Sequence, residues 1–455
     1  MGGTHDPHRL PDTPEPDEHM NAKRTLLATL MSGLLAGQPA LALDLLGAYE
    51  IAADSDPTLR AAAANRDALL EADDQALAQL LPSVGINGSY QRNRFDDRNT
   101  DQTSYSTDEV YTLSATQTLF RWDQFVALDQ ADSLVAQALA DYSAAEQELI
   151  IRLAEGYFNV LAAQDNLIFA RAELDAIGRQ LEQARERFEV GLIAITDVHE
   201  AQARYDLAVS QEIVAENELD SAREALYEIT GELNEPINPL NDQLQLLQPE
   251  PQETGVWVEK ALENNLNLVA LQAAVEAARQ EVKRQRAGHY PTLDASAALT
   301  RRDQNFGGIA GVKRHDASIG LELNIPLFQG GAVNSLTREA HYRFIESQEQ
   351  LDQARRQTQR QTRDAYRGVA SGIAQVRALE QALVSTETAL EAAETGFEVG
   401  TRTIVDVLDA QRERFRAQRD LARARYDYLL STLRLKQAAG SLGVDDLQAI
   451  NSWFQ

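Results

Sequence analysis

Cysteine is absent from this 455-residue chain. Its absence excludes disulfide bonds, thiolate metal sites, a cysteine nucleophile and a lipid anchor on an N-terminal cysteine. Catalytic signatures are missing as well, because the sequence contains no GxSxG, HExxH or phosphate-loop pattern. The sequence therefore indicates neither an enzyme nor a protein that carries a cofactor.

Basic residues are scarce. Lys and Arg total 42 against 70 Asp and Glu, which gives a net charge of −28. This excess of negative charge disfavours binding to nucleic acid or to an anionic lipid surface. We expect no nucleic-acid partner, and if the charge lines a cavity, it selects what enters.

The N-terminal segment has the layout of a secretory signal. Residues 20–42 have a basic start, an apolar run too short to span a membrane, and an Ala-Leu-Ala ending. Residues 1–19 are polar and acidic, which is a poor flank for a signal, so we expect a non-native leader and a natural start at Met20. Removal of 1–42 would leave a mature chain that begins at Leu43.

The rest of the chain is an internal repeat, with the second copy 209 residues after the first. We expect repeat 1 at 43–230, a proline-rich linker at 231–255, repeat 2 at 256–439 and a C-terminal segment at 440–455. The linker and the C-terminal segment are expected to pack around the middle of the helices. The matching pairs are Leu59 and Leu268, Pro82 and Pro291, Tyr157 and Tyr366, Gly191 and Gly400, and Asp197 and Asp406.

Each repeat is expected to contain one β-hairpin, at residues 82–121 and 291–328. In "SIGLELNIPLF" the apolar residues alternate with small or polar ones, which is typical of strands. The stretches 92–109 and 301–316 are rich in Asp, Asn, Arg and Gly and are expected as water-exposed loops. This leaves four strands of about ten residues each.

Very long helices are expected to follow each hairpin, at residues 122–190 and 333–399. These stretches contain no proline and almost no glycine, and at about 1.5 Å per residue each would be on the order of 100 Å long. Their apolar residues recur at three- and four-residue spacing, which favours coiled-coil-like packing. Shorter helices of about half that reach are expected at 48–80, 195–230, 256–287 and 402–439.

Four strands cannot stand alone in a membrane, because each open edge leaves unpaired backbone N–H and C=O groups. Two chains would supply eight strands, whose side chains nearly fill the interior, whereas three chains would supply twelve and leave a passage. A soluble β-sandwich is the competing interpretation. The secretory signal and the aromatic residues near the strand ends favour a membrane barrel.

Several motifs, in this order and spacing across both copies, resemble the TolC family of outer-membrane efflux and secretion channels. They are the doubled turn "VGLIAITDVHEA" and "VGTRTIVDVLDA", the "FQGGAVNS" after the fourth strand, and the "LPSV" and "YPTLD" before the first and third. The resemblance covers essentially the whole mature chain. It implies a mainly α-helical protein with a membrane β-barrel, in which a homotrimer forms a 12-strand barrel in outer-membrane lipid and a 12-helix tunnel in the periplasm.

The resemblance also implies a function. Such channels are passive exit ducts for multidrug efflux and type I protein secretion, and they are closed at the periplasmic tip. A periplasmic adaptor recruits an inner-membrane pump of the RND or ABC type, which supplies the energy. By resemblance, Gly191 and Gly400 mark the tips where the adaptor docks.

The two acidic turns reverse the chain from a long helix into a short one. Gly191 and Gly400 suit the left-handed position that ends a helix, and Asp406 at the start of the next helix suits its unpaired N–H groups. Helix capping does not explain Asp409, which lies three residues later on the same face. By resemblance, Asp406 and Asp409 form two stacked rings at the pore entrance. Such rings attract multivalent cations, and mutual repulsion is expected to raise the pKa of some carboxylates.

The resemblance also implies a gate restraint, in which Arg402 bridges to Thr196 and Asp197 of a neighbouring chain. The family pattern has a tyrosine where this chain has Phe397, and a phenyl ring cannot donate the hydroxyl hydrogen bond. Either the gate is held more weakly, or Glu186 offers Arg402 another acceptor.

A periplasmic coiled-coil adaptor or structural protein is the alternative function, because it would share the long helices and the secretory signal. Such a protein does not need two alternating hairpins. Extraction distinguishes the two, since a channel stays with the outer membrane as a stable trimer and an adaptor washes off.

Overall fold

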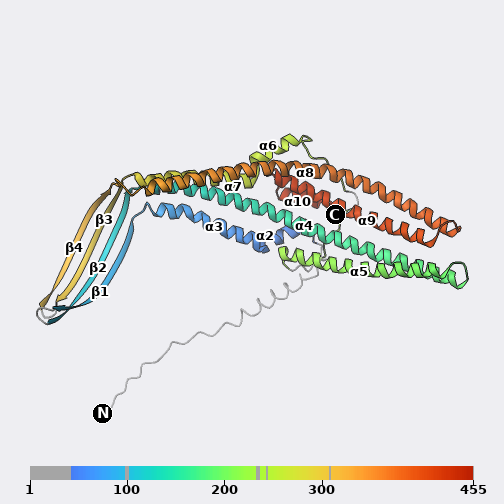
Figure 1. Ribbon diagram of the computed structural model, residues 1–455, viewed down its shortest axis with the longest axis horizontal. Coiled ribbons are helices and arrows are strands. Elements are labelled where there is room, and N and C mark those ends of the chain that lie inside the picture. The colour runs from blue at the N-terminus through green and yellow to red at the C-terminus, as the bar shows by residue number, and fades with distance from the viewer. Residues whose placement is uncertain (1–42, 98–101, 232–235, 242–243, 307–308, 454–455) are drawn as a thin grey trace, which may run out of the picture.

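The protein is elongated, with a β-sheet at one end and helices that run away from it to two turns at the opposite end (Figure 1). The computed structural model describes residues 43–97, 102–231, 236–241, 244–306, 309–453. The expected leader and signal, 1–42, lie outside the described residues. The mainly α-helical fold with a small sheet confirms the predicted fold class.

The sheet contains four antiparallel strands in the order β1-β2-β3-β4. Within the described part of the chain, β1 and β4 are its two edges, and each has a partner on one side only. The central pair, β2 and β3, joins the hairpin of one repeat to the hairpin of the other. The strands are β1 (Ser83–Asp97), β2 (Gln102–Phe120), β3 (Thr292–Phe306) and β4 (Ile309–Asn324).

The strands are longer than predicted. They contain 15, 19, 15 and 16 residues, so most of the stretches 92–109 and 301–316, expected as loops, belong to the sheet. The ladder between β1 and β2 continues to the pair Asp97 and Gln102. The expectation was wrong because hairpin pairing uses backbone groups, and it continues through polar residues once both faces of the strands meet water.

The two faces of the sheet differ in polarity. Val84, Ala115, Ala297 and Ile319 stand in one row across all four strands, and the neighbouring rows on that face are apolar except for Gln117. In the single chain this face is bare, and Ile319 is 91% exposed. The opposite face is polar, with side-chain contacts such as the 3.6 Å ion pair between Arg302 and Asp108 and the 3.2 Å bond between the hydroxyls of Thr112 and Thr300.

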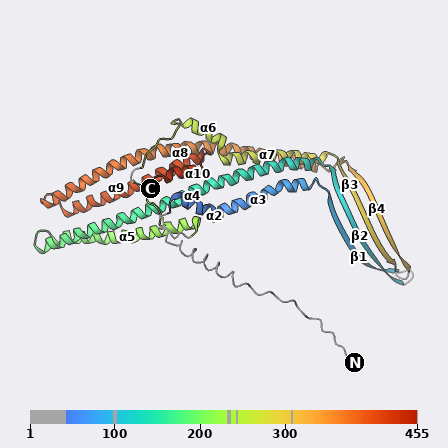
Figure 2. The same ribbon diagram turned by 180° about the vertical axis from the view of Figure 1, so that it is seen from behind.

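Two long helices, α4 (Trp122–Glu189) and α8 (Ala332–Glu398), lead from the sheet to the far turns. They contain 68 and 67 residues and end within one residue of the predicted positions. Each packs along the helix that follows it, α5 (Ile195–Thr230) or α9 (Ile404–Ala438), so that the distal half consists of two helix pairs (Figure 2). None of the described helices combines the length and apolarity needed to cross a membrane.

Two of the shorter predicted helices are each broken into two. Helix 48–80 is α2 (Leu45–Ser55) and α3 (Pro57–Ala78), and helix 256–287 is α6 (Thr254–Asn264) and α7 (Leu266–Arg286), followed by the 3₁₀ turn η2 (Ala287–His289). The breaks fall at Asp56 and Asn265, which occupy equivalent positions in the two repeats. Both have extended backbone, and the side chain of each accepts a hydrogen bond from the first turn of the next helix. Pro57 also disfavours helical backbone at Asp56.

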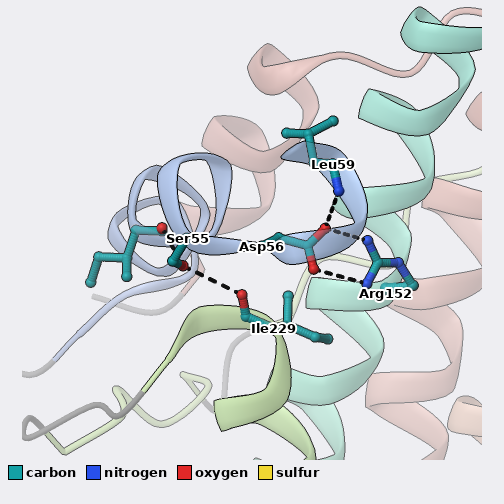
Figure 3. A network of polar contacts seen from close by, with 6 residues as sticks. Ser55, Asp56, Leu59, Arg152 and Ile229 are labelled. Atoms are coloured by element: carbon teal, nitrogen blue, oxygen red, sulfur yellow. Dashed lines mark hydrogen bonds and ion pairs between the residues drawn. The ribbon is translucent and has the colours of Figure 1, made fainter. Parts of the chain in front are cut away.

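Asp56 anchors the first break to the long helix α4 (Figure 3). Asp56 is only 1% exposed. Its carboxylate accepts a hydrogen bond from the Leu59 N–H at 2.7 Å and forms an ion pair with Arg152 at 2.8 Å. Burial alone would raise the Asp56 pKa, but the bonds from Arg152 and Leu59 outweigh it and lower that pKa below its ordinary value. The ionised carboxylate therefore holds α3 on α4.

The main apolar core lies in the middle of the molecule, where the linker and α10 (Val444–Asn451) meet the helices. Two buried tyrosines fix the linker there. The Tyr157 hydroxyl contacts the Leu43 and Asn238 carbonyls at 3.0 and 3.2 Å, and the Tyr428 hydroxyl donates to the Leu247 carbonyl at 3.0 Å. These hydroxyl hydrogen bonds hold the linker backbone against α4 and α9.

Candidate functional site at the helical tips

Both far turns follow the same backbone design. Gly191 and Gly400 have φ of 76° and 78°, in the left-handed region that favours glycine. In each turn a backbone N–H donates to a helical carbonyl five residues earlier, Leu192 to Arg187 at 2.8 Å and Thr401 to Gly396 at 2.8 Å. These are the bonds that close a helix C-terminus. The two glycines therefore form the extreme ends of the helix pairs, where they were predicted.

The two returning helices begin differently. Thr403 caps α9 in a reciprocal box with Asp406: the Asp406 N–H donates to the Thr403 hydroxyl at 3.3 Å, and the Thr403 N–H donates to the Asp406 carboxylate at 2.8 Å. In the first repeat Ala194 occupies the equivalent position, and α5 has no side-chain cap. Asp197 lies in the first turn of α5, where its negative charge stabilises the helix N-terminus. The Thr196 hydroxyl is 3.5 Å from the Asp197 carboxylate.

Asp406 is held inside its own chain. Hydrogen bonds from the Thr403 backbone and hydroxyl, together with the nearby Arg402 guanidinium, lower the pKa of Asp406 below its ordinary value. Within one chain this direction is opposite to the increase expected from repulsion in a carboxylate ring. That increase depends on other chains, so it stays a prediction.

Asp409 has partners that the sequence did not reveal. Its carboxylate pairs with Arg204 of α5 at 2.9 Å and lies 3.5 Å from Arg412 of α9. Arg412 could have been found from its three-residue spacing to Asp409. Arg204 could not, because it belongs to the other repeat and only the tertiary packing of α5 against α9 brings it close. The Arg204–Asp409 ion pair therefore joins the two helix pairs near their tips.

Arg402 lies across the end of α8. A Cβ at Gly396 would fall 2.6 Å from the Arg402 Cγ, so only glycine leaves room for this course of the side chain. The guanidinium is 3.7 Å from the Asp406 carboxylate, and the side chain is 61% exposed. In the described part of this single chain it forms no ion pair with Asp197.

Phe397 takes part in the apolar core of the tips. Its side chain is buried beside α9 residues such as Ile404 and Leu408. The Arg187 guanidinium of α4 lies 4.4 Å from the centre of the Phe397 ring, a cation–π contact that links α4 with α8. The sequence comparison of tyrosine with phenylalanine missed this contact. Glu186 is exposed, and no described cation lies within ion-pair distance of it.

Apolar side chains are exposed at both tips. Val190, Leu192 and Val399 are 70%, 72% and 70% exposed, beside the two turn glycines. Gathered at the ends of the molecule, these side chains are a candidate surface for contact with another protein.

The chain matches the family model described as "Outer membrane efflux protein" in two segments, residues 48–232 and 257–441. It is 39% identical to the outer membrane protein TolC of Vibrio cholerae, over 89% of this chain and 92% of that protein. It is 36% identical to TolC of Escherichia coli (94% and 89%), and 32% identical to the alkaline protease secretion protein AprF of Pseudomonas aeruginosa (92% and 89%).

Solved structures agree in fold. The outer membrane protein VceC of Vibrio cholerae aligns with a TM-score of 0.73 at 22% identity, over 88% of this chain and 96% of VceC. The CmeC outer membrane channel of Campylobacter jejuni aligns with a TM-score of 0.75 at 16% identity, over 99% and 98%. The two matched segments coincide with the two copies of the repeat, and the chain belongs to the outer membrane efflux protein family of Gram-negative outer-membrane channels.

Proposed function

We propose that three copies of this chain assemble into one passive exit duct, with a 12-strand barrel in the outer membrane and a 12-helix tunnel in the periplasm. The observation that carries the proposal is the open sheet, which is apolar along one face and polar along the other and has an unsatisfied edge on both β1 and β4. Hydrocarbon tolerates such edges only when strands of other copies close the ring. Removal of residues 1–42 would precede assembly, and 43–230 and 256–439 would act as the two repeats.

The duct would serve both efflux and type I secretion. Relatives include proteins named for protease secretion and for cobalt-zinc-cadmium resistance, and substrate choice would lie with the inner-membrane pump, of the RND or ABC type. The exposed apolar residues beside Gly191 and Gly400 support docking of a periplasmic adaptor at the tips. A coiled-coil adaptor role for this chain has no use for the apolar face of the sheet.

The gate would close where the helix pairs meet. Asp406 and Asp409 of three chains would form rings at the entrance, and Arg402 would reach Thr196 and Asp197 of a neighbour. The exposure of Arg402, which is bound only loosely to Asp406, supports such a bridge. Among the described residues no group of three or more metal-ligating side chains exists in one chain, so a multivalent cation would need carboxylates from several copies.

Purification in detergent followed by planar-bilayer recording tests the proposal. We expect a particle of threefold symmetry with a small single-channel conductance, because the tips are closed at rest. Replacing Arg402 with serine should raise the resting conductance. A monodisperse monomer without channel activity would contradict the proposed duct, and an unchanged conductance of Arg402→Ser would remove the bridge between chains from the gate.

A further inference from the structure

A stripe of positive charge runs along the exposed side of α8. This helix carries five arginines and one aspartate between residues 355 and 367, although the net charge of the whole chain is −28. Four of these arginines are exposed and recur every three or four residues, so they share one face of the helix. We call them the basic stripe, and they are Arg356, Arg360, Arg363 and Arg367.

Helix α5 carries a stripe of the opposite sign. Asp220, Glu224 and Glu228 are exposed and lie four residues apart, and we call them the acidic stripe. The buried residues of α5 at the same level include Leu219 and Leu226, which lie on the other side of the helix. The acidic stripe therefore points away from the helices on which α5 packs.

Neither stripe is neutralised by the rest of its own chain. In the described part of the chain, no carboxylate lies within ion-pair distance of Arg360 or Arg363. Over the same residues, Glu224 and Glu228 have no cation within that distance. The other members pair only with residues of their own helices in the described chain. Like charges at three- and four-residue spacing destabilise a lone helix, so each stripe favours an opposite charge beside it.

The two stripes lie on opposite flanks of one copy. Helices α4 and α9 pack on each other and stand between α5 and α8 (Figure 1 and Figure 2). The inward side of α8 is marked by the buried residues Thr362 and Val369, and the basic stripe lies about half a turn away from them. A single chain therefore keeps the two stripes apart, and only a second molecule can cover either one.

Closure of the barrel would bring these flanks of neighbouring copies together. Strand β4 leads into α8, and β1 follows α3, so pairing of β4 with β1 of the next copy sets α8 beside the neighbouring α3. Helices α3 and α5 both pack on α4 and follow each other along it. Ser55, two residues before α3, donates to the carbonyl of Thr230 at the end of α5 at 3.0 Å. Helix α8 would therefore continue from the neighbouring α3 onto the neighbouring α5.

Contacts with the intervening helices show the level of each stripe along the molecule. On one side of α4, a Cβ at Gly156 would fall 3.2 Å from the Leu226 side chain of α5. On the other side, Glu155 pairs with Arg434 of α9. About one turn further along α9, a serine side chain lies against Gly368 of α8. Residues near 227 on α5 and near 366 on α8 are therefore at about the same level.

A threefold rotation keeps this level, because its axis runs along the tunnel. Glu228 of one copy and Arg367 of the next would lie within about one helical turn of each other, or about 5 Å along the axis. Arg363 and Glu224 lie one turn further on either side. Helices in contact are about 8–10 Å apart, a distance that arginine and glutamate side chains span together.

The flanks also match in size nearer the tips. The face of α5 that carries the acidic stripe continues with Ile213, which is 61% exposed. The face of α8 that carries the basic stripe continues with Ala374, Ala378 and Ser385, which are exposed and small. Ile213 lies 15 residues toward the tip from Glu228, and residue 382 lies equally far from the end of the basic stripe. A large apolar side chain would therefore meet small ones, as in closely packed helices.

We propose that the basic stripe of each copy binds the acidic stripe of the next copy, so that three identical charged contacts join the helical part of the trimer. The partner is a second copy of this chain, because charge, level and size all match. The inference rests on the proposed duct, and it adds which helices meet and which charges join them.

Cysteine crosslinking tests the contact, because the chain contains no cysteine of its own. Glu228→Cys with Arg367→Cys, treated as the purified assembly with a short bis-maleimide, should give covalent dimers and trimers on a denaturing gel. Each single variant should give monomers. The matched control is Asp206→Cys with Arg367→Cys, which should not link. Asp206 is exposed on the same face of α5 but lies roughly 30 Å nearer the tip.

Charge reversal provides a second test that does not depend on a crosslinker. Arg363→Glu with Arg367→Glu should raise the rate of trimer dissociation in detergent on the order of a hundredfold, because like charges would then face each other. Addition of Glu224→Arg and Glu228→Arg should restore most of the wild-type rate, which a separate structural role of each stripe would not do. Arg355→Glu, exposed on the same helix but off the stripe, should leave the rate unchanged.

A wild-type trimer whose 228–367 pair links no better than the control would overturn the inference and leave the duct standing. If reversal of the arginines changes ion selectivity in bilayers and leaves trimer dissociation unchanged, the basic stripe lines the tunnel and the pairing is wrong. Failure of the four-residue variant to recover would also contradict the pairing. Absence of any trimer in the wild type would refute the duct itself, which separates the two proposals.

Discussion

The ion pair between Arg204 and Asp409 gives the sharpest prediction for the gate. It joins α5 of the first helix pair to α9 of the second with a 2.9 Å contact between two partly exposed side chains. Any opening that moves the two helix pairs apart has to break it. Arg204→Ser removes the pair without touching either turn, so we expect more frequent or wider opening.

The size of the effect follows from the exposure of the pair. The Arg204 and Asp409 side chains are 34% and 44% exposed, and an ion pair of this kind contributes about 0.5–1 kcal/mol. If the three pairs of a trimer break together, the closed state loses roughly 1.5–3 kcal/mol, which changes the closed-to-open ratio about tenfold to a hundredfold. The change also releases Asp409, so block by multivalent cations should strengthen.

Single-channel recording in planar bilayers measures both effects. Arg171→Ser is the matched control, because Arg171 pairs with Glu212 at 3.1 Å and Glu216 at 3.4 Å and so links α4 only to its own partner α5. It should leave opening unchanged. If both serine variants open to the same extent, or if neither differs from the wild type, the contact between helix pairs does not restrain the gate.

Three further changes follow from the structure. Asp406→Ala with Asp409→Ala should abolish block by multivalent cations in bilayer recordings, and persistent block would place the cation site elsewhere. Phe397→Leu removes the ring under Arg187 and keeps most of the apolar volume. If the three contacts of a trimer, each worth about 1 kcal/mol, are lost together, the closed-to-open ratio should fall by up to about a hundredfold and the resting conductance should rise. An unchanged conductance would show that the cation–π contact does not restrain the gate. Asp56→Ala should lower the free energy of unfolding by about 2–4 kcal/mol, because it removes a helix cap and a charged hydrogen bond. Asp56→Asn should keep the cap, so its free energy of unfolding should fall by less. The Asp56 pKa is lowered in the folded protein, so the charged hydrogen bond stabilises the fold fully above the ordinary carboxyl pKa. This stabilisation is lost as the pH falls through the lowered pKa. The difference in thermal midpoint between the wild type and Asp56→Asn should therefore become smaller in acid.

Much of the fold could be predicted because its signals are local or repeated. The long helices end within a residue of prediction, since glycines and a cap sit at their C-terminal turns. The breaks at Asp56 and Asn265 were missed, although Asp56-Pro57 is a readable boundary, because apolar spacing continues across both of them. Strand length was underestimated because polar residues obscure the alternation on which strand prediction depends.

The functional site, too, could be predicted from the sequence only in part. The turn glycines and the acidic start of α9 could be located from the sequence, because a left-handed backbone and a reciprocal cap depend on residues a few positions apart. The partners of those residues could not, because Arg204 reaches Asp409, and Arg187 reaches Phe397, across more than two hundred positions of chain.

The sequence by itself determined the doubled architecture, the places where the chain reverses, and the family, since each is written in short motifs and in their repetition. Only the tertiary structure decided which charged and aromatic side chains of different helices meet. Ion pairs and cation–π contacts depend on how two helix pairs are rotated and set against each other, and that arrangement results from the packing of the whole apolar core rather than from any one segment.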